Sequence, residues 1–152
     1  MTTYNQRLHV KYTAPQMFDL VADVERYPEF VPWIIEARVR HRDAQTMRVD
    51  MTIGTGFLAK QFATIAQLDR PHRIDIRSSD PIVERFEQGW TFEPSVDGGT
   101  VVEYYVDFEL RSRLLQMLIG RTIAGRGAMM VAAFNHRARR LYGQAHAARP
   151  LR

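Results

Sequence analysis

The dominant pattern in this chain is the alternation of apolar and polar residues over short stretches. Val102, Tyr104, Val106, Phe108 and Leu110 alternate with three acidic residues and a tyrosine. A period of two places successive side chains on opposite faces of a strand, one face covered and the other in water. The same period predicts seven strands, at residues 6–12, 35–41, 47–53, 57–68, 74–76, 85–93 and 102–110. The faces expected to be covered carry Leu8, Val10, Tyr12, Ile35, Ala37, Val39, His41, Met47, Val49, Met51, Ile53, Phe86, Trp90 and Phe92, with Gln88 as a polar exception.

Two short helices are expected between the first and second strands. Thr13 followed by Gln16 fits a capping box, and apolar residues from 17 to 24 recur at helical spacing. Pro28 is expected to close this helix and to open a second one, which Pro32 ends. The resulting elbow would present three aromatic side chains from a rigid backbone: Tyr27, Phe30 and Trp33.

A long helix is expected near the C-terminal end. Ser112 is a good N-cap, and helical spacing continues to about Tyr142, where Gly143 follows. Three glycines between residues 120 and 127 each cost up to ~1 kcal/mol relative to alanine, so a kink or a locally open region is expected there. The stripe expected to be covered comprises Leu115, Ile119, Ile123, Gly127, Met130, Phe134, Ala138 and Leu141.

The order of these elements predicts an α+β fold. Six strands follow the two short helices without further alternation of strands and helices, which favours a curved antiparallel sheet of seven strands around the long helix. Residues 1–146 are expected to form this single domain, and residues 147–152 a frayed basic tail. An apolar cavity would remain wherever inner side chains do not meet. Aromatic and methionine stripes are ordinarily core packing, however, so the side chains alone favour a filled core.

The charge distribution is uneven along the chain. Residues 1–109 carry a net charge of −5, whereas residues 110–152 contain nine arginines and no acidic residue. Arginine suits bidentate contacts with phosphate, and a basic helix face would attract an anionic partner. A solvated helix face has the same composition, so both interpretations stay open.

Composition and spacing exclude several classes of function. The absence of cysteine excludes disulfides, thiol catalysis and cysteine-ligated metals, and the five histidines lack metal-ligand spacing, so no metal site is expected. No apolar run approaches ~18 residues and no signal-peptide pattern is present, so a cytoplasmic protein is expected. The polar residues at or near the covered face are His41, Lys60, Glu84 and Gln88. No two of them have a spacing typical of a catalytic dyad, so no enzyme is expected.

Four segments carry a resemblance to a known family: YTAPQMFDLVADVERYPEFVPW, PHRIDI, FEQGWTFEP and SRLLQMLIGR. With them, nearly the whole chain resembles the coenzyme Q-binding family of START-like domains, also described as helix-grip, Bet v 1-like or polyketide cyclase/dehydrase-type. The matches to the family's DVexYPxFxPW motif are Asp23, Tyr27, Pro28, Phe30, Pro32 and Trp33, and Trp90 and Phe92 match its WxF strand.

This resemblance implies a hydrophobic tunnel that binds ubiquinone or a related isoprenoid lipid and supports respiratory quinone function without catalysis and without a further cofactor. A bacterial branch of the family is described as a ribosome-association toxin that binds the large ribosomal subunit and hinders subunit joining. The resemblance does not choose between these two functions. Mitochondrial members carry a transit peptide, which this chain lacks, so a bacterial protein is expected.

Two sets of residues are predicted to act in binding. The ligand-binding set comprises Phe30, Trp33, Phe62, Trp90, Phe92, Tyr104, Val106, Phe108, Leu118, Met130 and Phe134. The surface docking set on the last helix comprises Arg113, Arg121, Arg137, Arg139 and Arg140. The docking partner would be an anionic membrane surface, the inner face of the bacterial inner membrane, with the large ribosomal subunit as the alternative partner and no DNA.

Overall fold

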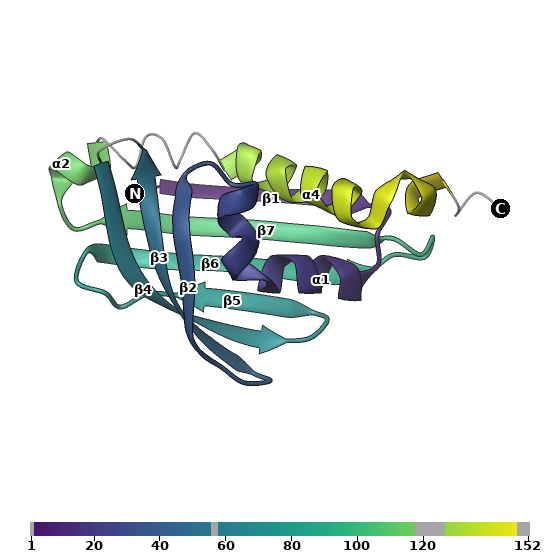
Figure 1. Ribbon diagram of the computed structural model, residues 1–152, viewed down its shortest axis with the longest axis horizontal. Coiled ribbons are helices and arrows are strands. Elements are labelled where there is room, and N and C mark those ends of the chain that lie inside the picture. The colour runs from purple at the N-terminus through teal and green to yellow at the C-terminus, as the bar shows by residue number, and fades with distance from the viewer. Residues whose placement is uncertain (1, 56–57, 118–126, 149–152) are drawn as a thin grey trace.

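Seven strands form one antiparallel sheet in the computed structural model of the protein, which describes residues 2–55, 58–117 and 127–148 (Figure 1). The strands are β1 (Thr2–Val10), β2 (Ile34–Arg42), β3 (Thr46–Thr55), β4 (Leu58–Asp69), β5 (Arg73–Arg77), β6 (Val83–Pro94) and β7 (Thr100–Leu110). The helices are α1 (Ala14–Ala22), the 3-10 helix η1 (Val24–Glu29), α2 (Arg113–Leu115) and α4 (Gly127–Ala148). This architecture confirms the predicted α+β class and the two short helices between the first two strands.

The strand order is β1-β7-β6-β5-β4-β3-β2. Every strand therefore pairs with the strand that follows it in the chain, except that β1 and β2 lie at opposite edges. β1 pairs with β7 at one edge, and α1 and η1 carry the chain across to β2 at the other edge. In Figure 1, β2, β3 and β4 run steeply across the direction of β6 and β7, while α1, η1 and α4 lie over one face. The strong twist between the two halves curves the sheet, and the core lies between its concave face and the helices.

Strand β2 departs from the predicted alternation. Ile34 is buried whereas Ile35 is 47% exposed, although Ile35 was expected on the covered face. The register shifts between Ile34 and Glu36 and again between Val39 and His41, and an extra residue in a strand reverses the face of the side chains beyond it. His41 is also exposed, and its ring lies 3.2 Å from the Asp43 carboxylate.

The elbow of α1 and η1 begins as predicted and ends differently. The Thr13 hydroxyl accepts from the Gln16 backbone N–H, and the Gln16 side chain accepts from the Thr13 N–H, which completes the capping box. η1 already begins at Val24 and contains Pro28, so the prediction that Pro28 opens the second helix is wrong. The Tyr27 hydroxyl donates to the Val21 carbonyl and ties η1 to α1.

The expected C-terminal helix is described as two helices, α2 and α4; its middle, residues 118–126, lies outside the described residues. In α4, Met130, Phe134 and Ala138 face the core as predicted, but Leu141 is 53% exposed. Tyr142 takes its place, with its ring centroid 5.8 Å from that of Tyr12. Gly143 interrupts the helix with φ 76°, which suits glycine, and α4 continues to Ala148.

Candidate functional site

A cavity of about 60 Å³ lies between the concave face of the sheet and the first turn of α4. Its walls come from the end of the elbow, from β2, β3, β4, β6 and β7, and from one methionine of α4. The lining residues are Trp33, Ile34, Met51, Ile53, Phe62, Phe86, Gln88, Tyr104, Val106, Phe108 and Met130. Nine of these eleven are apolar, so the cavity suits an apolar ligand.

The predicted ligand-binding residues divide into two groups. Those that line the cavity are Trp33, Phe62, Tyr104, Val106, Phe108 and Met130. Phe30, Trp90, Phe92 and Phe134 do not line it but pack against one another beside it, and Leu118 lies outside the described residues. The Phe134 ring centroid lies 5.0 Å from that of Phe30 and 5.0 Å from that of Trp90. These rings fill their part of the core, which leaves the free space to the other group.

Five lining residues are absent from the predicted set: Ile34, Met51, Ile53, Phe86 and Gln88. Alternation had placed Met51, Ile53 and Phe86 on covered faces, so the signal for their burial was present in the sequence. Ile34 could not be found in this way, because the bulge in β2 reverses its face. Gln88 is the polar exception on the covered face of its strand, so the alternation predicts its burial but not its place in the site.

Gln88 and Tyr104 form a polar pair inside the apolar cavity. The Gln88 amide nitrogen donates to the Tyr104 hydroxyl oxygen at 2.9 Å, and both residues are buried. Trp90 packs on Tyr104 with ring centroids 4.5 Å apart. Burial raises the pKa of the Tyr104 phenol well above its ordinary value, so the phenol keeps its proton at physiological pH.

The other polar candidates lie away from the cavity. His41, Lys60 and Glu84 are exposed, and the Glu84 carboxylate pairs with Arg111 at 2.7 Å. Among the described residues, no group of three or more histidine and acidic side chains is arranged to hold a metal ion.

The predicted docking arginines are not equivalent. Arg113, Arg139 and Arg140 are exposed and make no ion pair with the described residues, and Arg121 lies outside them. Arg137, which was expected on the exposed face, has a side chain only 16% exposed. Its Nη2 donates to Glu29 Oε1 at 2.8 Å, and its guanidinium lies 5.0 Å from the centre of the Phe30 ring. Arg137 therefore joins α4 to η1 and is not available to a partner surface.

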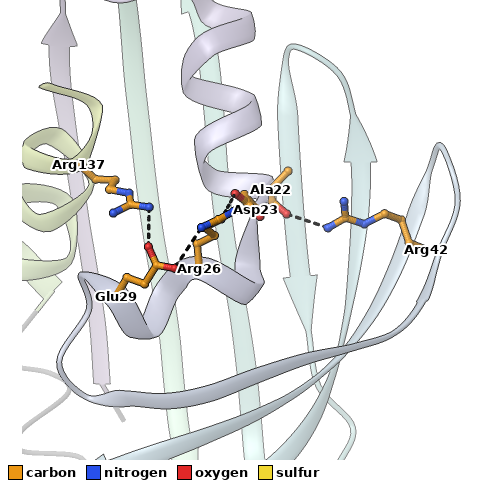
Figure 2. Close-up of polar contacts among 6 residues, drawn as sticks. All are labelled: Ala22, Asp23, Arg26, Glu29, Arg42 and Arg137. Atoms are coloured by element: carbon orange, nitrogen blue, oxygen red, sulfur yellow. Dashed lines mark hydrogen bonds and ion pairs between the residues drawn. The ribbon is translucent and has the colours of Figure 1, made fainter. Parts of the chain in front are cut away.

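The contact between Arg137 and Glu29 belongs to a chain of ion pairs along the elbow (Figure 2). Arg26 lies between the carboxylates of Glu29 and Asp23, at 3.3 Å and 3.6 Å. The hydrogen bond from Arg137 holds the pKa of the Glu29 carboxyl below its ordinary value. Nearby, Arg42 donates to the Ala22 carbonyl at 3.2 Å and so links β2 to the end of α1.

Large apolar side chains are exposed in and just after α2 and in the first turn of α4. Leu114 is 65% exposed, Met117 follows it one helical turn later at 64%, and Met129 in α4 is 50% exposed. The exposed Arg113 precedes them in the chain. No described helix is long and apolar enough to cross a membrane.

Comparison with known proteins places the chain in a recognised group. The family profile for "Polyketide cyclase / dehydrase and lipid transport" matches residues 10–135. The "Ribosome association toxin RatA" of Escherichia coli K12 is 31% identical over 133 residues, which are 88% of this chain and 84% of that protein. The "Coenzyme Q-binding protein COQ10 homolog B, mitochondrial" of Xenopus laevis is 26% identical over 145 residues, 93% of this chain and 59% of that protein.

Solved structures confirm the START-like fold. A START superfamily protein from Mycobacterium smegmatis superposes with a TM-score of 0.73 at 16% identity, covering 93% of this chain and 99% of that one. The Zhui aromatase/cyclase from a Streptomyces species superposes with a TM-score of 0.72 at 17% identity, covering 94% and 96%. Similarity at this level of identity shows the fold alone, and the fold is used by binding proteins and by enzymes.

Proposed function

We propose, from the premise that this chain belongs to the polyketide cyclase/dehydrase and lipid transport family, that it binds an apolar lipid between its sheet and α4. The observation that carries this proposal is the cavity itself. Its described walls are apolar except for one amide and one phenol, and they border a tightly packed aromatic cluster, which Tyr104 contacts through Trp90. A ligand that fills this space would remove apolar surface from water, which favours binding by a free energy of about 25 cal/mol per Å² buried.

The ligand class we favour is ubiquinone or a related isoprenoid lipid. A flat ring suits walls built from Trp33, Phe62 and Tyr104, and one relative is named as a coenzyme Q-binding protein. The cavity of about 60 Å³ is smaller than the ~300–1,000 Å³ of typical ligand sites. Met51 and Met130 are the wall residues with flexible, unbranched side chains, so binding would enlarge the cavity by moving them.

We further propose that binding proceeds without catalysis. General acid–base chemistry needs a carboxylate, an imidazole or a similar group of suitable pKa inside the site. The described lining residues provide an amide and a phenol whose pKa is raised by burial, neither of which titrates near neutral pH. Turnover of a polyketide substrate by the purified protein would contradict this part of the proposal.

Mass spectrometry tests the lipid function directly. Protein purified from its native host is extracted with organic solvent, and the extract is compared with that of the variant Val106→Trp, in which a large ring occupies the cavity. We expect a quinone or another isoprenoid lipid in the first extract and a much smaller amount in the second. The proposal fails if neither extract contains such a lipid and the purified protein does not bind added ubiquinone.

Delivery of a lipid would require contact with a membrane surface. Arg113, Arg139 and Arg140 are exposed positive charges, and each contributes about 1 kcal/mol near an anionic leaflet. Leu114 and Met117 are exposed apolar side chains next to Arg113 and suit the interfacial region of the bilayer. We therefore propose a cytoplasmic protein that docks peripherally and reversibly on the inner face of the bacterial inner membrane.

A second candidate function is association with the large ribosomal subunit. The observations that favour it are the relatives named ribosome association toxin and the nine arginines without an acidic residue after Glu109. Arginine contacts with RNA phosphates would weaken steeply as salt increases. Sedimentation with isolated large subunits at low and high salt tests this function, and a protein that stays at the top of the low-salt gradient does not have it.

A further inference from the structure

The buried polar pair in the cavity has more hydrogen-bond donors than it uses. The Gln88 amide carries two N–H groups and the Tyr104 phenol carries one O–H group. The bond of 2.9 Å between the two side chains uses one of these three donors. Gln88 is 7% exposed and Tyr104 is 4% exposed, so bulk water does not satisfy the others.

This surplus does not depend on how the amide is oriented. If the amide nitrogen faces Tyr104, as described above, then the phenol hydrogen and the second amide hydrogen remain. If the amide oxygen faced Tyr104 instead, the phenol would donate to it and both amide hydrogens would remain. In either case two donors remain without an acceptor among the described residues, and both side chains line the cavity.

The surroundings make these donors costly to leave unused. The pair lies diagonally across β6 and β7, where Gln88 is opposite Val106 and Tyr104 is opposite Trp90. Phe86 and Phe108 line the cavity beside it. A buried donor that finds no acceptor destabilises the folded state, whereas an apolar pair of similar shape would carry no such cost. The raised pKa of Tyr104 keeps its hydrogen in place over the physiological pH range.

We propose that Gln88 and Tyr104 form the polar end of the ligand site: with the amide nitrogen facing Tyr104, the phenol hydrogen and the second amide hydrogen donate to one oxygen atom of an otherwise apolar ligand. This inference rests on the lipid-binding function proposed above and adds the chemistry that selects the ligand. The oxygen must be an acceptor such as a ring carbonyl, and the walls around the pair require apolar surface on every other side of it. An isoprenoid hydrocarbon without oxygen would leave both donors unused and would bind less tightly.

The experiment compares two ligands and two forms of the protein. The ligands are a ubiquinone with a short saturated tail and an alkylbenzene with the same tail and no oxygen. The proteins are the wild type and the double variant Gln88→Leu/Tyr104→Phe, which removes both polar groups together and so leaves no unpaired partner. Titration followed by tryptophan fluorescence gives both affinities, and thermal melting verifies that the double variant is folded.

We expect the wild type to prefer the quinone and the double variant to lose on the order of tenfold in quinone affinity, with alkylbenzene affinity unchanged or higher. The infrared carbonyl band of the bound quinone should lie at lower frequency in the wild type than in the double variant, which a purely structural role of the pair would not produce. The control Val106→Ala alters an apolar wall and should weaken both ligands to a similar extent.

Two results would overturn the inference in different ways. If the wild type binds both ligands and the double variant binds the quinone equally well, the polar pair does not select the ligand, although the lipid function stands. If the wild type binds neither ligand, the inference and the proposed lipid function fail together.

Discussion

The two halves of the core are built from the same kinds of residue and yet differ in packing. Around Phe134, the rings of Tyr27, Phe30 and Trp90 lie with centroids 5.0 to 5.1 Å away and fill the space between elbow, sheet and α4. Around Met130, the inner faces of β3, β4 and β7 leave a cavity. The difference shows that aromatic content does not decide whether a core is filled. Among the described residues, the filled half is the one in which the elbow, the sheet and α4 all contribute rings to the same contact.

The elbow provides that close packing in the filled half. η1 contributes Tyr27, and Arg137 fastens the elbow to α4 through Glu29 and the face of Phe30. The cavity half has only Met130 from the described part of α4. Substitutions in the filled half should therefore act mainly on stability, and substitutions in the cavity half mainly on binding.

The largest effect is expected from Phe134→Ala in the filled half. Phe134 is 1% exposed and touches three other rings, so its truncation should cost about 3–5 kcal/mol and lower the melting temperature by roughly 6–20 °C. Thermal melting followed by circular dichroism measures this. Leu141→Ala on the exposed side of the same helix is the control and should change stability by less than ~0.5 kcal/mol. A small loss for Phe134→Ala would show that the two halves are packed alike.

A smaller loss of stability is expected from Trp33→Ala, because the Trp33 ring borders free space and loses fewer contacts. The same variant should weaken the binding of a short-chain ubiquinone on the order of tenfold or more, and Pro32→Ala should act in the same direction by loosening the backbone before Trp33. Melting and titration are measured on the same samples. Phe92→Ala is the matched variant from the filled half. It should lower the melting temperature strongly and change the quinone affinity little. A large melting shift for Trp33→Ala with unchanged affinity would place Trp33 in the core only.

A pH-dependent effect is expected from Glu29→Gln, which breaks the fastening between α4 and η1. The pKa of Glu29 is lowered in the folded state by Arg137, so its contribution to stability is present above the ordinary value of 4.5 and is lost as the pH falls through the lowered value. Wild type and variant should therefore differ in melting temperature at pH 7 and converge in acid. Glu93→Gln on the exposed face of β6 is the control. A difference that persists below the lowered pKa would mean that charge is not the cause.

The smallest effect on stability is expected from Arg139→Gln/Arg140→Gln. Both side chains are exposed and make no ion pair with the described residues, so the melting temperature should not change. Flotation with vesicles that contain anionic lipid should show binding reduced on the order of tenfold, and the reduction should disappear at high salt. Equal flotation of wild type with neutral vesicles would show that these arginines are solvated and passive. Arg137→Gln should show the reverse pattern, a lower melting temperature with little change in flotation.

Much of the fold could be predicted from local pattern. Alternation identifies β7 almost residue by residue, and the capping box of Thr13 and Gln16 begins α1 where expected. The bulge at Ile34 could not be predicted from the residues of β2. A bulge changes which face of the sheet a side chain takes, and the alternation pattern alone does not show where it occurs. Tyr142 rather than Leu141 packs against the core, and spacing could not choose between them, because residues three and four positions after Ala138 both continue a helical stripe.

The sequence by itself determined the inward-facing residues wherever strand or helix spacing is regular, as in β7, because the periods of two and 3.6 are properties of the backbone. It also determined that Gln88 would stand among aromatic side chains. Only the tertiary structure decided that Trp90 and Phe134 fill the core while Val106 and Met130 border a cavity, because that depends on which side chains of distant elements meet at each position. The tertiary structure also decided that Arg137 links α4 to η1 instead of facing solvent. Its partners Glu29 and Phe30 lie over 100 residues away in the chain, so the local sequence pattern could not indicate this contact.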